Sequence, residues 1–355
     1  MVPVQHRHAD AAQTPTPLPL EVEQITAAWL GEALSTPARR VEVDEVTITE
    51  VVPGTATKVR VEARYGVGDP GLPTRMCVKG GFDRGLRGFM GPGYQAEARF
   101  YRDVAGSLDG GLAACHFAGV DPAVGQGIVI LDDLVSRGAT FANAVDPLTV
   151  DQAGAALELL AAWHRCSVPE VDWLAGTALY RAMASALISA QWDGEVGDMS
   201  ASVAEALGTK GELLAAFEEL WADEDRRPRR FVHGDANLTN LYHDECGSPH
   251  FLDWQFAARS DAYHDVAFFL IGALDPNDRR AAEEELLRTY LSARGADSEP
   301  FDVAWDAYRR QALYGIIYAL TPEQMQPAAI RGAMADRFAQ AVLDHRSWDL
   351  LLEKR

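Results

Sequence analysis

Polar residues that could carry out chemistry lie between two apolar stretches in RFVHGDANLTNLYHD, residues 230–244. A single asparagine or aspartate is enough to turn a chain, but this segment combines an imidazole at His233, a carboxylate at Asp235 and a carboxamide at Asn240. A carboxylate can take the proton of an incoming hydroxyl group, and carboxylate and carboxamide oxygens are ligands for Mg²⁺. The segment is therefore a candidate catalytic loop as well as a turn.

A second carboxylate, Asp253 in HFLDWQ, follows at the end of the next apolar strand. We expect a hairpin in which Asn240 begins the first strand and Asp253 ends the second, after a turn near residues 244–249. The two ends of a hairpin lie side by side, so Asn240 and Asp253 should come together, with Asp235 nearby. Such a pair of oxygen ligands suits Mg²⁺, which takes few protein ligands and adds phosphate oxygens, and Asp235 would act as the general base.

The order His-x-Asp-x4-Asn followed by a strand-end aspartate, as in His233, Asp235, Asn240 and Asp253, is that of the catalytic and metal-binding residues of kinases. The alternative is that these residues only cap turns. Kinase chemistry also needs a lysine for the phosphate groups and a partner for that lysine. The N-terminal part of the chain must supply both.

A lysine and a glutamate with the required order are present in that part. The apolar strand RMCVKGG carries Lys79 near its end, and the following helix, in GYQAEARFY, carries Glu97. Burying a lysine without a partner is costly, so we expect Glu97 to be its counter-ion and the pair to anchor nucleotide phosphates. The alternatives are that Lys79 reaches solvent from an edge strand and that Glu97 lies on a solvated helix face.

Two further segments could contact a nucleotide. VVPGTATKV is typical of a strand, a turn and a strand, and backbone N–H groups at Gly54 and Thr55 could cover the phosphates, although the segment contains only one glycine. IVILDDL is apolar until two aspartates end it. This pattern favours a strand whose following backbone, at Asp132, Asp133 and Leu134, contacts adenine. The alternative is an ordinary buried strand followed by a loop.

The segments that must position these residues change in character along the chain. The first third contains β-branched residues that alternate with polar ones, which indicates strands, and two segments with helical spacing. The expected strands are 41–52, 58–65, 74–81 and 125–135, and the expected helices are 20–34 and 91–108. After these segments the pattern is mainly helical, apart from short strands around residues 231 and 251.

This change predicts an α+β fold of two lobes, with a small antiparallel sheet and one main helix in the N-lobe. The larger C-lobe would be mostly helical and would carry the catalytic hairpin. We expect residues 1–20 to form a disordered tail, and residues 21–133 to form an N-lobe that binds the nucleotide phosphates. Residues 134–355 would form the C-lobe, with the catalytic loop, metal site and substrate pocket, and a cleft between lobes is a common ligand site.

The charge of the chain disfavours some classes of partner. Its 355 residues include 52 acidic and 32 basic ones, which gives a formal net charge of −20. The basic residues do not cluster, so nucleic acid and anionic membranes are disfavoured. The 4 cysteines are scattered, as in proteins of reducing compartments, and no segment has the pattern of a signal peptide or membrane span. We expect a soluble cytoplasmic protein, monomeric or homodimeric.

Several segments resemble, in the same order, those of the aminoglycoside phosphotransferase and choline kinase superfamily. They are CVKGGF, QAEARFYRDV, VILDDL, LAAWHRC, FVHGDANLTNLYHD and FLDWQFAARSDAYHDVAFFL. The resemblance covers about residues 45 to 275 and is strongest to the ecdysteroid-kinase-like branch, whose members phosphorylate hydroxyl groups of small molecules. It implies a bilobal, protein-kinase-like fold that uses ATP and Mg²⁺.

The resemblance also implies roles for individual residues. Asp235 would be the catalytic base, Asn240 and Asp253 the magnesium ligands, and Lys79 and Glu97 the pair that anchors the phosphates. The chain departs from the family pattern in its glycine-poor first turn and in the glutamine two positions after the metal-binding aspartate. The first departure leaves the phosphate contacts of that turn uncertain, whereas the glutamine is compatible with the branch.

Other polar and aromatic residues have supporting interpretations. We expect His233 to brace the catalytic loop, because Asp235 already has the role of base. Asp265 could hold this loop by hydrogen bonds, or it could be an ordinary carboxylate at a helix N-terminus. Asp261 would cap a helix, His164 would be a hydrogen-bonded histidine of the core, and Trp254 would pack beside the metal loop.

Together these features predict an enzyme that transfers a phosphoryl group from ATP to a hydroxyl of a small molecule. The first alternative is a phosphotransferase of aminoglycosides or other antibiotics, and the second is a pseudokinase that binds nucleotide without turnover. A protein kinase is disfavoured, because no APE-like segment follows Asp253 and the chain enters the apolar segment DVAFFLIGAL too soon for a long activation loop.

The acceptor pocket is less clearly marked. WDAYRRQALYGIIYAL would place five side chains, Trp305, Tyr308, Gln311, Tyr314 and Tyr318, on a single helix. Such a stripe is typical of a core, but it would also suit the body of a moderately apolar alcohol. An aminoglycoside would need clustered carboxylates, for which WADEDRR is the available segment, although we expect that segment to be a solvated loop.

Overall fold

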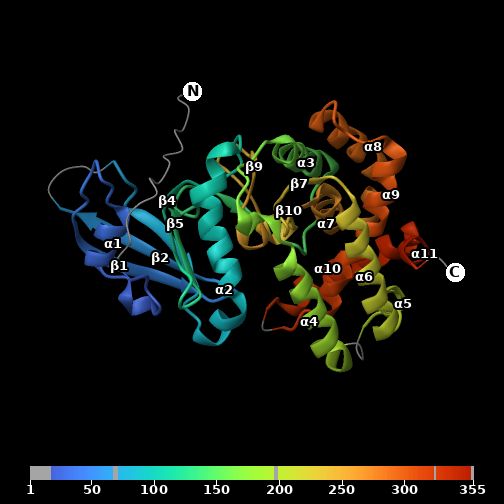
Figure 1. Ribbon diagram of the computed structural model, residues 1–355, viewed down its shortest axis with the longest axis horizontal. Coiled ribbons are helices and arrows are strands. Elements are labelled where there is room, and N and C mark those ends of the chain that lie inside the picture. The colour runs from blue at the N-terminus through green and yellow to red at the C-terminus, as the bar shows by residue number, and fades with distance from the viewer. Residues whose placement is uncertain (1–16, 67–70, 196–198, 324, 353–355) are drawn as a thin grey trace. The chain divides into compact units, whose positions relative to one another are not determined.

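The computed structural model divides the chain into two compact units (Figure 1). It describes residues 17–66, 71–195, 199–323 and 325–352. The first unit is Met1–Thr140 with Asp253–Gln255, and the second is Phe141–Leu252 with Phe256–Arg355. An antiparallel sheet dominates the first unit and helices dominate the second, which confirms the predicted α+β class.

The units do not follow the expected limits of the lobes. The first long segment of the first unit ends at Thr140. The short segment Asp253–Gln255 also belongs to the first unit, although more than 100 positions of the sequence separate it from Thr140. Residues 1–16 of the expected tail lie outside the described residues. Leu18, from the end of that tail, is buried in the core of the first unit. The functions expected for the two parts remain predictions.

A five-stranded antiparallel sheet of order β1-β2-β3-β5-β4 forms the first unit. Its strands are β1 (Val43–Val52), β2 (Thr57–Tyr65), β3 (Arg75–Gly80), β4 (Cys115–Asp121) and β5 (Gln126–Asp132). Since side chains alternate between the faces of a strand, Val59 and Val61 of β2 share a face with Val78 of β3, and all three are buried with Trp29 and Leu30. This apolar face gives the unit its core.

Two helices belong to this unit. α1 (Ala27–Leu34) starts after Thr26, whose side chain accepts a hydrogen bond from the backbone N–H of Trp29. α2 (Arg84–Arg99) packs against β5, so closely that a Cβ atom at Gly127 would lie 2.1 Å from the carbonyl oxygen of Tyr94. The second helix therefore requires glycine at this position of the sheet.

The main helix starts earlier than the sequence predicts. The carboxylate of Asp83 caps α2 by accepting hydrogen bonds from the backbone N–H groups of Gly85 and Leu86, and Pro92 lies inside the helix rather than before it. After Arg99 the chain continues as a π-helical stretch, η2 (Phe100–Val104), and a 3-10 turn, η3 (Ala105–Ser107). The expected helix of residues 91–108 is thus shifted toward the N-terminus.

The second unit consists of helices around short strands. Its helices are α3 (Val150–Arg165), α4 (Ala178–Glu195), α5 (Ala201–Leu207), α6 (Lys210–Arg226), α7 (Ala262–Ala273), α8 (Pro276–Arg294), α9 (Phe301–Gln311), η8 (Tyr314–Leu320), α10 (Ala328–His345) and α11 (Ser347–Leu351). Its strands are β7 (Arg229–Val232), β8 (Leu241–His243), β9 (Pro249–Phe251) and β10 (Ala258–Asp261), while β6 (Thr140–Phe141) lies where the units meet in sequence.

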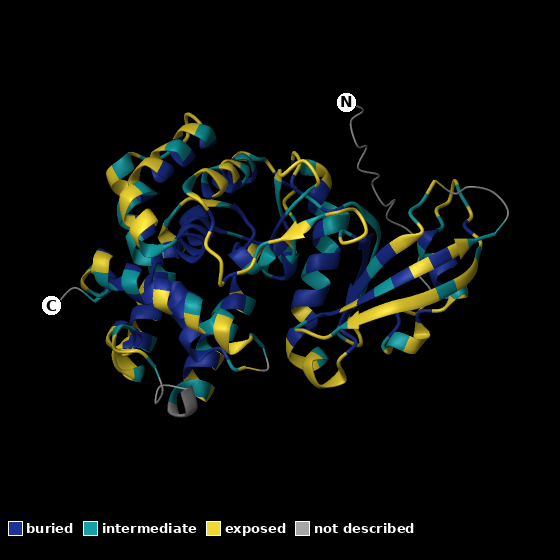
Figure 2. Cartoon of the chain, turned by 180° about the vertical axis from the view of Figure 1, so that it is seen from behind, coloured by how far each residue is buried: buried dark blue, intermediate teal, exposed yellow. Residues whose placement is uncertain are grey.

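Helix α7 is the centre of the second unit. Each of its residues from Ala262 to Ala273 is buried, as expected for a helix that is apolar on all sides, and Figure 2 shows the buried residues in dark blue. β10 precedes α7 directly and pairs with β7 in an antiparallel ladder, with Ala258 opposite Val232. The N-terminus of the central helix therefore lies beside the strand that leads into the candidate catalytic loop.

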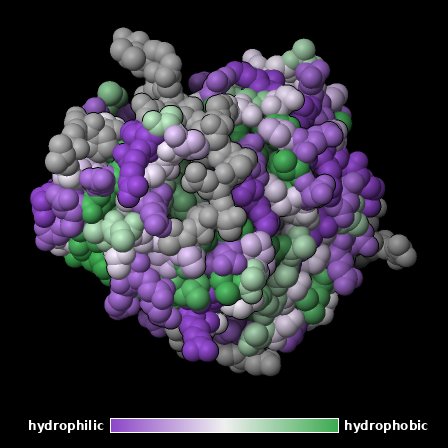
Figure 3. Space-filling model, turned by 60° about the vertical axis from the view of Figure 1, so that its left-hand side comes forward, coloured by the Kyte–Doolittle hydropathy of each residue, from purple (hydrophilic) through white to green (hydrophobic). Residues whose placement is uncertain are grey.

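The surface agrees with the acidic composition. The face in Figure 3 is mainly hydrophilic, and its apolar residues form small separate patches. None of the helices in the described ranges combines the length and the apolar character that a membrane-spanning segment needs.

Candidate active site

Three charged side chains meet in the first unit, and we call them the Lys79 cluster: Lys79, Glu97 and Asp253. The Nζ atom of Lys79 lies 2.8 Å from a carboxylate oxygen of Glu97 and 2.9 Å from Oδ1 of Asp253. Lys79 and Glu97 are almost fully buried, at 5% and 3% exposure. The ion pair expected from the order of strand lysine and helix glutamate is therefore present, and Asp253 joins it.

Local structure explains why these residues meet. The side chains of Met76 and Val78 on β3 enter the core with α1, so Lys79 points to the opposite face of the strand. α2 brings Glu97 to this lysine. Burial alone would lower the pKa of Lys79, but attraction to Asp253 and then to Glu97 raises that pKa above its usual value. The lysine is therefore charged, while burial raises the pKa of Glu97 more than the charge of Lys79 lowers it.

An aromatic stack holds the chain next to Asp253. The ring of Trp254 is fully buried and stacks on Phe100 of η2, with the ring centroids 3.9 Å apart and the planes 7° from parallel. Asp253 itself has a φ of 69°, in the left-handed region that residues other than glycine seldom adopt. The stack and the ion pair with Lys79 stabilise this backbone conformation, and they direct the carboxylate toward the lysine.

The turn between β1 and β2 carries Gly54 and Thr55. The hydroxyl of Tyr94 on α2 donates a hydrogen bond to the carbonyl oxygen of Thr55 at 2.5 Å. The turn is thereby tied to the same helix that carries Glu97, while Gly54 is exposed. The turn contains a single glycine, and the role of its backbone N–H groups toward phosphates stays a prediction.

The end of β5 carries the three residues expected to meet adenine. The carboxylate of Asp132 binds Nε2 of His116 and Nε of Arg137, each at 2.8 Å, and Asp133 lies 3.5 Å from Nε of Arg60. The carbonyl oxygen of Leu134 accepts a hydrogen bond from Ala139 at 3.0 Å. Both aspartate side chains and the carbonyl oxygen of Leu134 are therefore engaged within the same unit, and the contact with adenine stays a prediction.

The second unit carries the Asp235 loop, residues 233–240, between β7 and β8. The two carboxylate oxygens of Asp235 accept hydrogen bonds from the side-chain amides of Asn237 and Asn240, each at 2.8 Å. The carbonyl oxygen of Asn240 accepts from the backbone of Leu252 at 2.9 Å, and Leu241 pairs with Phe251. The hairpin therefore has the expected register, with the residue before Asp253 opposite Asn240.

Asp265 of α7 holds this loop from below. Its carboxylate accepts hydrogen bonds from the backbone N–H groups of His233 at 2.6 Å and Gly234 at 2.9 Å. Gly234 has a φ of 79°, and a Cβ atom there would lie 2.1 Å from the carbonyl oxygen of Phe256, so the position requires glycine. Of the two interpretations of Asp265, the structure confirms the one in which it holds the loop by hydrogen bonds.

Two histidines support the same loop. His233 binds the carbonyl oxygen of Leu252 through Nε2 at 2.9 Å, and its Nδ1 accepts from the backbone of Asp235 at 3.2 Å. His164 of α3 binds Asp265 at 3.1 Å and the hydroxyl of Tyr290 at 2.8 Å. His164 is buried and hydrogen-bonded, as predicted, but its link to Asp265 was not visible in the sequence, because 101 positions separate the two residues.

The predicted aromatic stripe of residues 305–320 does not lie on one helix. α9 ends at Gln311 and the 3-10 segment η8 follows, so the stripe divides. Tyr308 binds Glu283 on the far side of α9. Burial and then the charge of Asp235 raise the pKa values of Tyr314 and Tyr318 well above the usual value. Only this second pair therefore belongs to the surroundings of the Asp235 loop.

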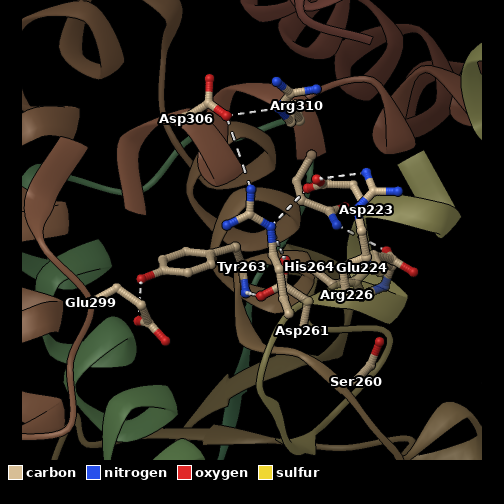
Figure 4. Close-up of polar contacts among 12 residues, drawn as sticks. Asp223, Glu224, Arg226, Ser260, Asp261, Tyr263, His264, Glu299, Asp306 and Arg310 are labelled. Carbon is tan, nitrogen blue, oxygen red and sulfur yellow. Dashed lines mark hydrogen bonds and ion pairs between the residues drawn. The ribbon is translucent and has the colours of Figure 1, made fainter. Parts of the chain in front are cut away.

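The acidic segment of residues 221–227 is not the expected solvated loop. It lies on α6 and contains Glu224, which is 1% exposed. Arginines neutralise its carboxylates: Asp223 binds Arg227 at 2.7 Å, and Asp225 binds Arg181 at 2.9 Å. Figure 4 labels Asp223, Glu224 and Arg226 of this segment. The segment therefore has little free negative charge to offer to a polycationic ligand.

The chemistry of the expected metal ligands fits Mg²⁺. Within the described residues there is no group of three or more His, Cys, Asp or Glu side chains that could hold a metal ion by itself. Asn240 donates through its Nδ2 atom to Asp235, which turns its Oδ1 atom away from that carboxylate as a possible ligand. Asp253 offers carboxylate oxygens, of which Oδ1 contacts Lys79 at 2.9 Å. Hard oxygen ligands of this kind suit a Mg²⁺ ion that also binds phosphate.

A comparison with family models places the chain in one family. Residues 96–310 match the family described as APH, the phosphotransferase enzyme family. Plasmodium vivax ethanolamine kinase has a similar fold, with a TM-score of 0.54 and 13% identity, over 86% of this chain and 85% of that chain. No curated protein matches the chain.

Two bacterial structures are less similar. Choline kinase LicA from Streptococcus pneumoniae has a TM-score of 0.47 and 17% identity, over 86% of this chain and 94% of that chain. An aminoglycoside phosphotransferase from Streptomyces rimosus has a TM-score of 0.46 and 15% identity, over 77% of this chain and 92% of that chain. The predicted kinase-like fold is confirmed by the ethanolamine kinase.

Proposed function

The chain belongs to the phosphotransferase enzyme family, and we propose that it transfers the γ-phosphoryl group of ATP to a hydroxyl group of a small molecule. The observation that carries this proposal is the Lys79 cluster, in which a buried lysine lies 2.8 Å from Glu97 and 2.9 Å from Asp253. A lysine fixed by a helix glutamate, next to an aspartate that can bind metal, is the arrangement with which kinases hold the phosphates of ATP.

In this proposal the first unit binds the nucleotide. Lys79, held by Glu97, orients and neutralises the phosphate oxygens, and backbone N–H groups at Gly54 and Thr55 cover them. The backbone from Asp132 to Leu134 contacts adenine. The predicted N-lobe of residues 21–133 therefore has the nucleotide as its ligand, and residues 134–355 have the catalytic loop and the acceptor.

The Asp235 loop performs the proton transfer. Asp235 accepts a hydrogen bond from the acceptor hydroxyl, directs its oxygen at the γ-phosphorus and takes its proton as the new O–P bond forms and the bond to ADP breaks. Asn240 and Asp253 would hold Mg²⁺, which neutralises charge on the β- and γ-phosphates when it is bound. Because the transition state is loose, positioning and charge neutralisation carry most of the rate acceleration.

We propose an alcohol with a largely apolar body as the acceptor, as in the ecdysteroid-kinase-like branch. Support comes from the surroundings of Asp235, where Tyr314 and Tyr318 are buried among aromatic rings that include Phe268, at 5.2 and 5.9 Å between centroids. An aminoglycoside or other antibiotic is the second candidate. It has less support, because arginines neutralise Asp223 and Asp225 on α6. A pseudokinase is disfavoured by the complete set of residues for catalysis.

A screen of acceptors tests this function. Hydroxylated metabolites and antibiotics are offered with Mg-ATP, ADP release is measured, and phosphorylated products are identified by mass spectrometry. We expect turnover with an apolar alcohol, and loss of this turnover in Asp235→Ala, while Asp278→Asn, an exposed aspartate of α8, retains it. Undiminished turnover in Asp235→Ala would disprove the role of the base. Nucleotide binding without any phosphorylated product would favour the pseudokinase.

A further inference from the structure

We propose that His264 of α7, held as an imidazolium by Glu224 of α6, is a positioning residue that fixes the peptide bond directly before Asp235. The inference rests on the proposed function, because it concerns the geometry of the proposed base. His264 is not part of the motif that marks the Asp235 loop, and Glu224 belongs to the segment from which the sequence predicts a solvated loop.

The geometry around Gly234 is the first argument. Two consecutive residues of α7 hold it at both ends: Asp265 accepts from its N–H at 2.9 Å, and Nε2 of His264 lies 3.3 Å from its carbonyl oxygen. This carbonyl belongs to the peptide bond that joins Gly234 to Asp235, and the N–H of that bond donates to Nδ1 of His233 at 3.2 Å. The orientation of Asp235 therefore depends on His264.

The two ring nitrogens of His264 give the second argument. Nε2 faces the carbonyl oxygen of Gly234, and Nδ1 lies 3.5 Å from Oε1 of Glu224. A neutral imidazole has one N–H group, whereas an imidazolium has two, so only the charged ring can donate toward both oxygens. The contact of Nδ1 with Glu224 is an ion pair without hydrogen-bond geometry. Burial alone would lower the pKa of His264, but the adjacent carboxylate of Glu224 raises it above its usual value.

Two tyrosines pack on the ring of His264. Tyr180 of α4 stacks on its ring at 4.7 Å, and Tyr314 of η8 meets it edge-on at 4.4 Å. Burial raises the pKa values of both tyrosines, so they stay neutral. Burial favours the neutral forms of Glu224 and Asp265, but their contacts with histidines lower both pKa values, so these groups stay ionised.

Glu224 is itself fully engaged. Its Oε2 atom accepts from the hydroxyl of Tyr180 at 3.0 Å and from Arg181 at 2.9 Å, and its Oε1 atom accepts from Gln311 at 2.9 Å. Figure 4 labels both Glu224 and His264 among these polar contacts. These donors fix the carboxylate of Glu224 opposite the imidazole of His264. The negative charge that favours the protonated form of His264 therefore comes from a buried and fixed side chain.

A second group of the same four residue types provides a matched control. We call the groups the Glu224 quartet, which is Tyr180, Arg181, Glu224 and His264, and the Glu283 quartet, which is Arg279, Glu283, Tyr308 and His345. In the latter, Glu283 accepts from Tyr308 at 3.0 Å, from His345 at 3.2 Å and from Arg279 at 2.9 Å. The Glu283 quartet lies on α8, α9 and α10, and none of its described hydrogen bonds reaches the Asp235 loop.

The test compares His264→Leu and His264→Asn with His345→Leu and His345→Asn, using ADP release with Mg-ATP and the acceptor from the screen. We expect His264→Leu to lower kcat about 100-fold with an unchanged KM for ATP, because a displaced base costs about this much. His264→Asn keeps an N–H donor, so its kcat should be about tenfold higher than that of His264→Leu. The His345 variants should lower the melting temperature by similar amounts and leave kcat of the folded enzyme unchanged.

A pH profile distinguishes positioning from stability. The kcat of the wild type should fall at alkaline pH as the imidazolium loses its proton, and His264→Asn should lack this decline. Equal kcat values in His264→Leu and His345→Leu, or superimposable profiles of wild type and His264→Asn, would overturn the inference. If His264→Leu does not fold, the profile of His264→Asn decides.

The side-chain ¹⁵N shifts of His264 give a readout that needs no substrate. At pH 7 they should report a protonated ring in the wild type and a neutral ring in Glu224→Gln, and a neutral ring in the wild type would overturn the inference. Failure of the proposed function looks different, since no acceptor would then be phosphorylated by the wild type. Turnover that depends on Asp235 but is indifferent to His264 refutes this inference alone.

Discussion

The Lys79 cluster of the first unit and the Asp235 loop of the second are stabilised in different ways. The Lys79 cluster consists of three charged side chains from separate segments, joined by ion pairs of 2.8 and 2.9 Å. In the Asp235 loop the backbone is held, through hydrogen bonds from His233 and Gly234 to Asp265. A change of charge should therefore disrupt the first region most, whereas a loss of hydrogen-bond geometry should disrupt the second.

The difference corresponds to the proposed tasks. A phosphate-binding site needs a fixed charge, and burial makes the attraction between Lys79 and its partners stronger than it would be in water. A general base needs a fixed direction instead. The carboxylate of Asp235 accordingly has neutral partners, the amides of Asn237 and Asn240, which orient it without competing for its negative charge as an arginine would.

Removal of the charge of Lys79 should have the larger effect. Lys79→Met leaves the buried carboxylate of Glu97 and the partly exposed carboxylate of Asp253 without a counter-ion, and breaking a buried ion pair costs about 3–5 kcal/mol of stability. We expect kcat/KM for ATP to fall at least about 100-fold, with a weaker affinity for ATP measured by calorimetry. Lys210→Met, at the start of α6, is the control. Wild-type ATP affinity in Lys79→Met would contradict the role of this cluster.

Removal of one acceptor from the Asp235 loop should have a smaller and different effect. In Asp265→Asn one of the two backbone N–H groups faces an amide NH₂ group, which costs about 1–3 kcal/mol. We expect kcat to fall roughly 10- to 100-fold while the KM for ATP stays unchanged, with Asp278→Asn as the control. An equal loss of ATP affinity would show that the two regions cannot be separated in this way.

The pH dependence of stability in Asp265→Asn gives a second test of how the Asp235 loop is held. Burial alone would raise the pKa of Asp265. The hydrogen bond and charge of His164 lower this pKa by more than burial raises it, so the net pKa lies below its usual value. A depressed carboxyl pKa contributes stability above the ordinary value of about 3.9, and this stability is lost as the pH falls through the folded value. Thermal unfolding should therefore show a steeper acid loss of stability in the wild type than in Asp265→Asn.

The smallest effect is expected at the aromatic surroundings of the loop. Tyr318→Phe removes a hydroxyl near Asp235 and keeps the ring, which stacks on Phe268 at 5.9 Å. In the proposed acceptor pocket this hydroxyl would hydrogen-bond the acceptor, so its removal should raise the KM for the acceptor by about 3- to 10-fold and leave ATP affinity unchanged. Steady-state kinetics with both substrates checks this. A change in the KM for ATP alone would place Tyr318 outside the acceptor pocket.

The sequence predicts the parts of this site that depend on short spacings. Asp235 and Asn240 lie in one loop, and Asp253 ends the hairpin that begins at Asn240, so a local pattern reveals them. Lys79 and Glu97 are found because a strand and the next helix place them in order. Strands β1, β2 and β3 of the first unit follow from their two-residue alternation, which depends only on neighbouring residues, and β5 follows from its apolar run, whereas β4 (Cys115–Asp121) was not predicted.

Contacts between distant segments could not be predicted in this way. Glu224 and His264 are 40 positions apart in sequence, and neither belongs to a motif. The predicted start of α2 was wrong. A proline usually marks the first turn of a helix, but Pro92 lies inside α2. The prediction of one helix over residues 305–320 was also wrong. α-Helical and 3-10 periodicities differ little over a few turns, so the sequence pattern does not reveal the change of helix type after Gln311.

Single-turnover phosphoryl transfer in Asp235→Asn tests the central claim most directly. The enzyme is mixed with radiolabelled Mg-ATP and the acceptor from the screen, and labelled product is measured by rapid quench, with ATP affinity measured on the same samples. We predict a loss of about 100- to 10,000-fold in the transfer rate at unchanged ATP affinity. Labelled product formed at the wild-type rate would contradict the assignment of Asp235 as the base.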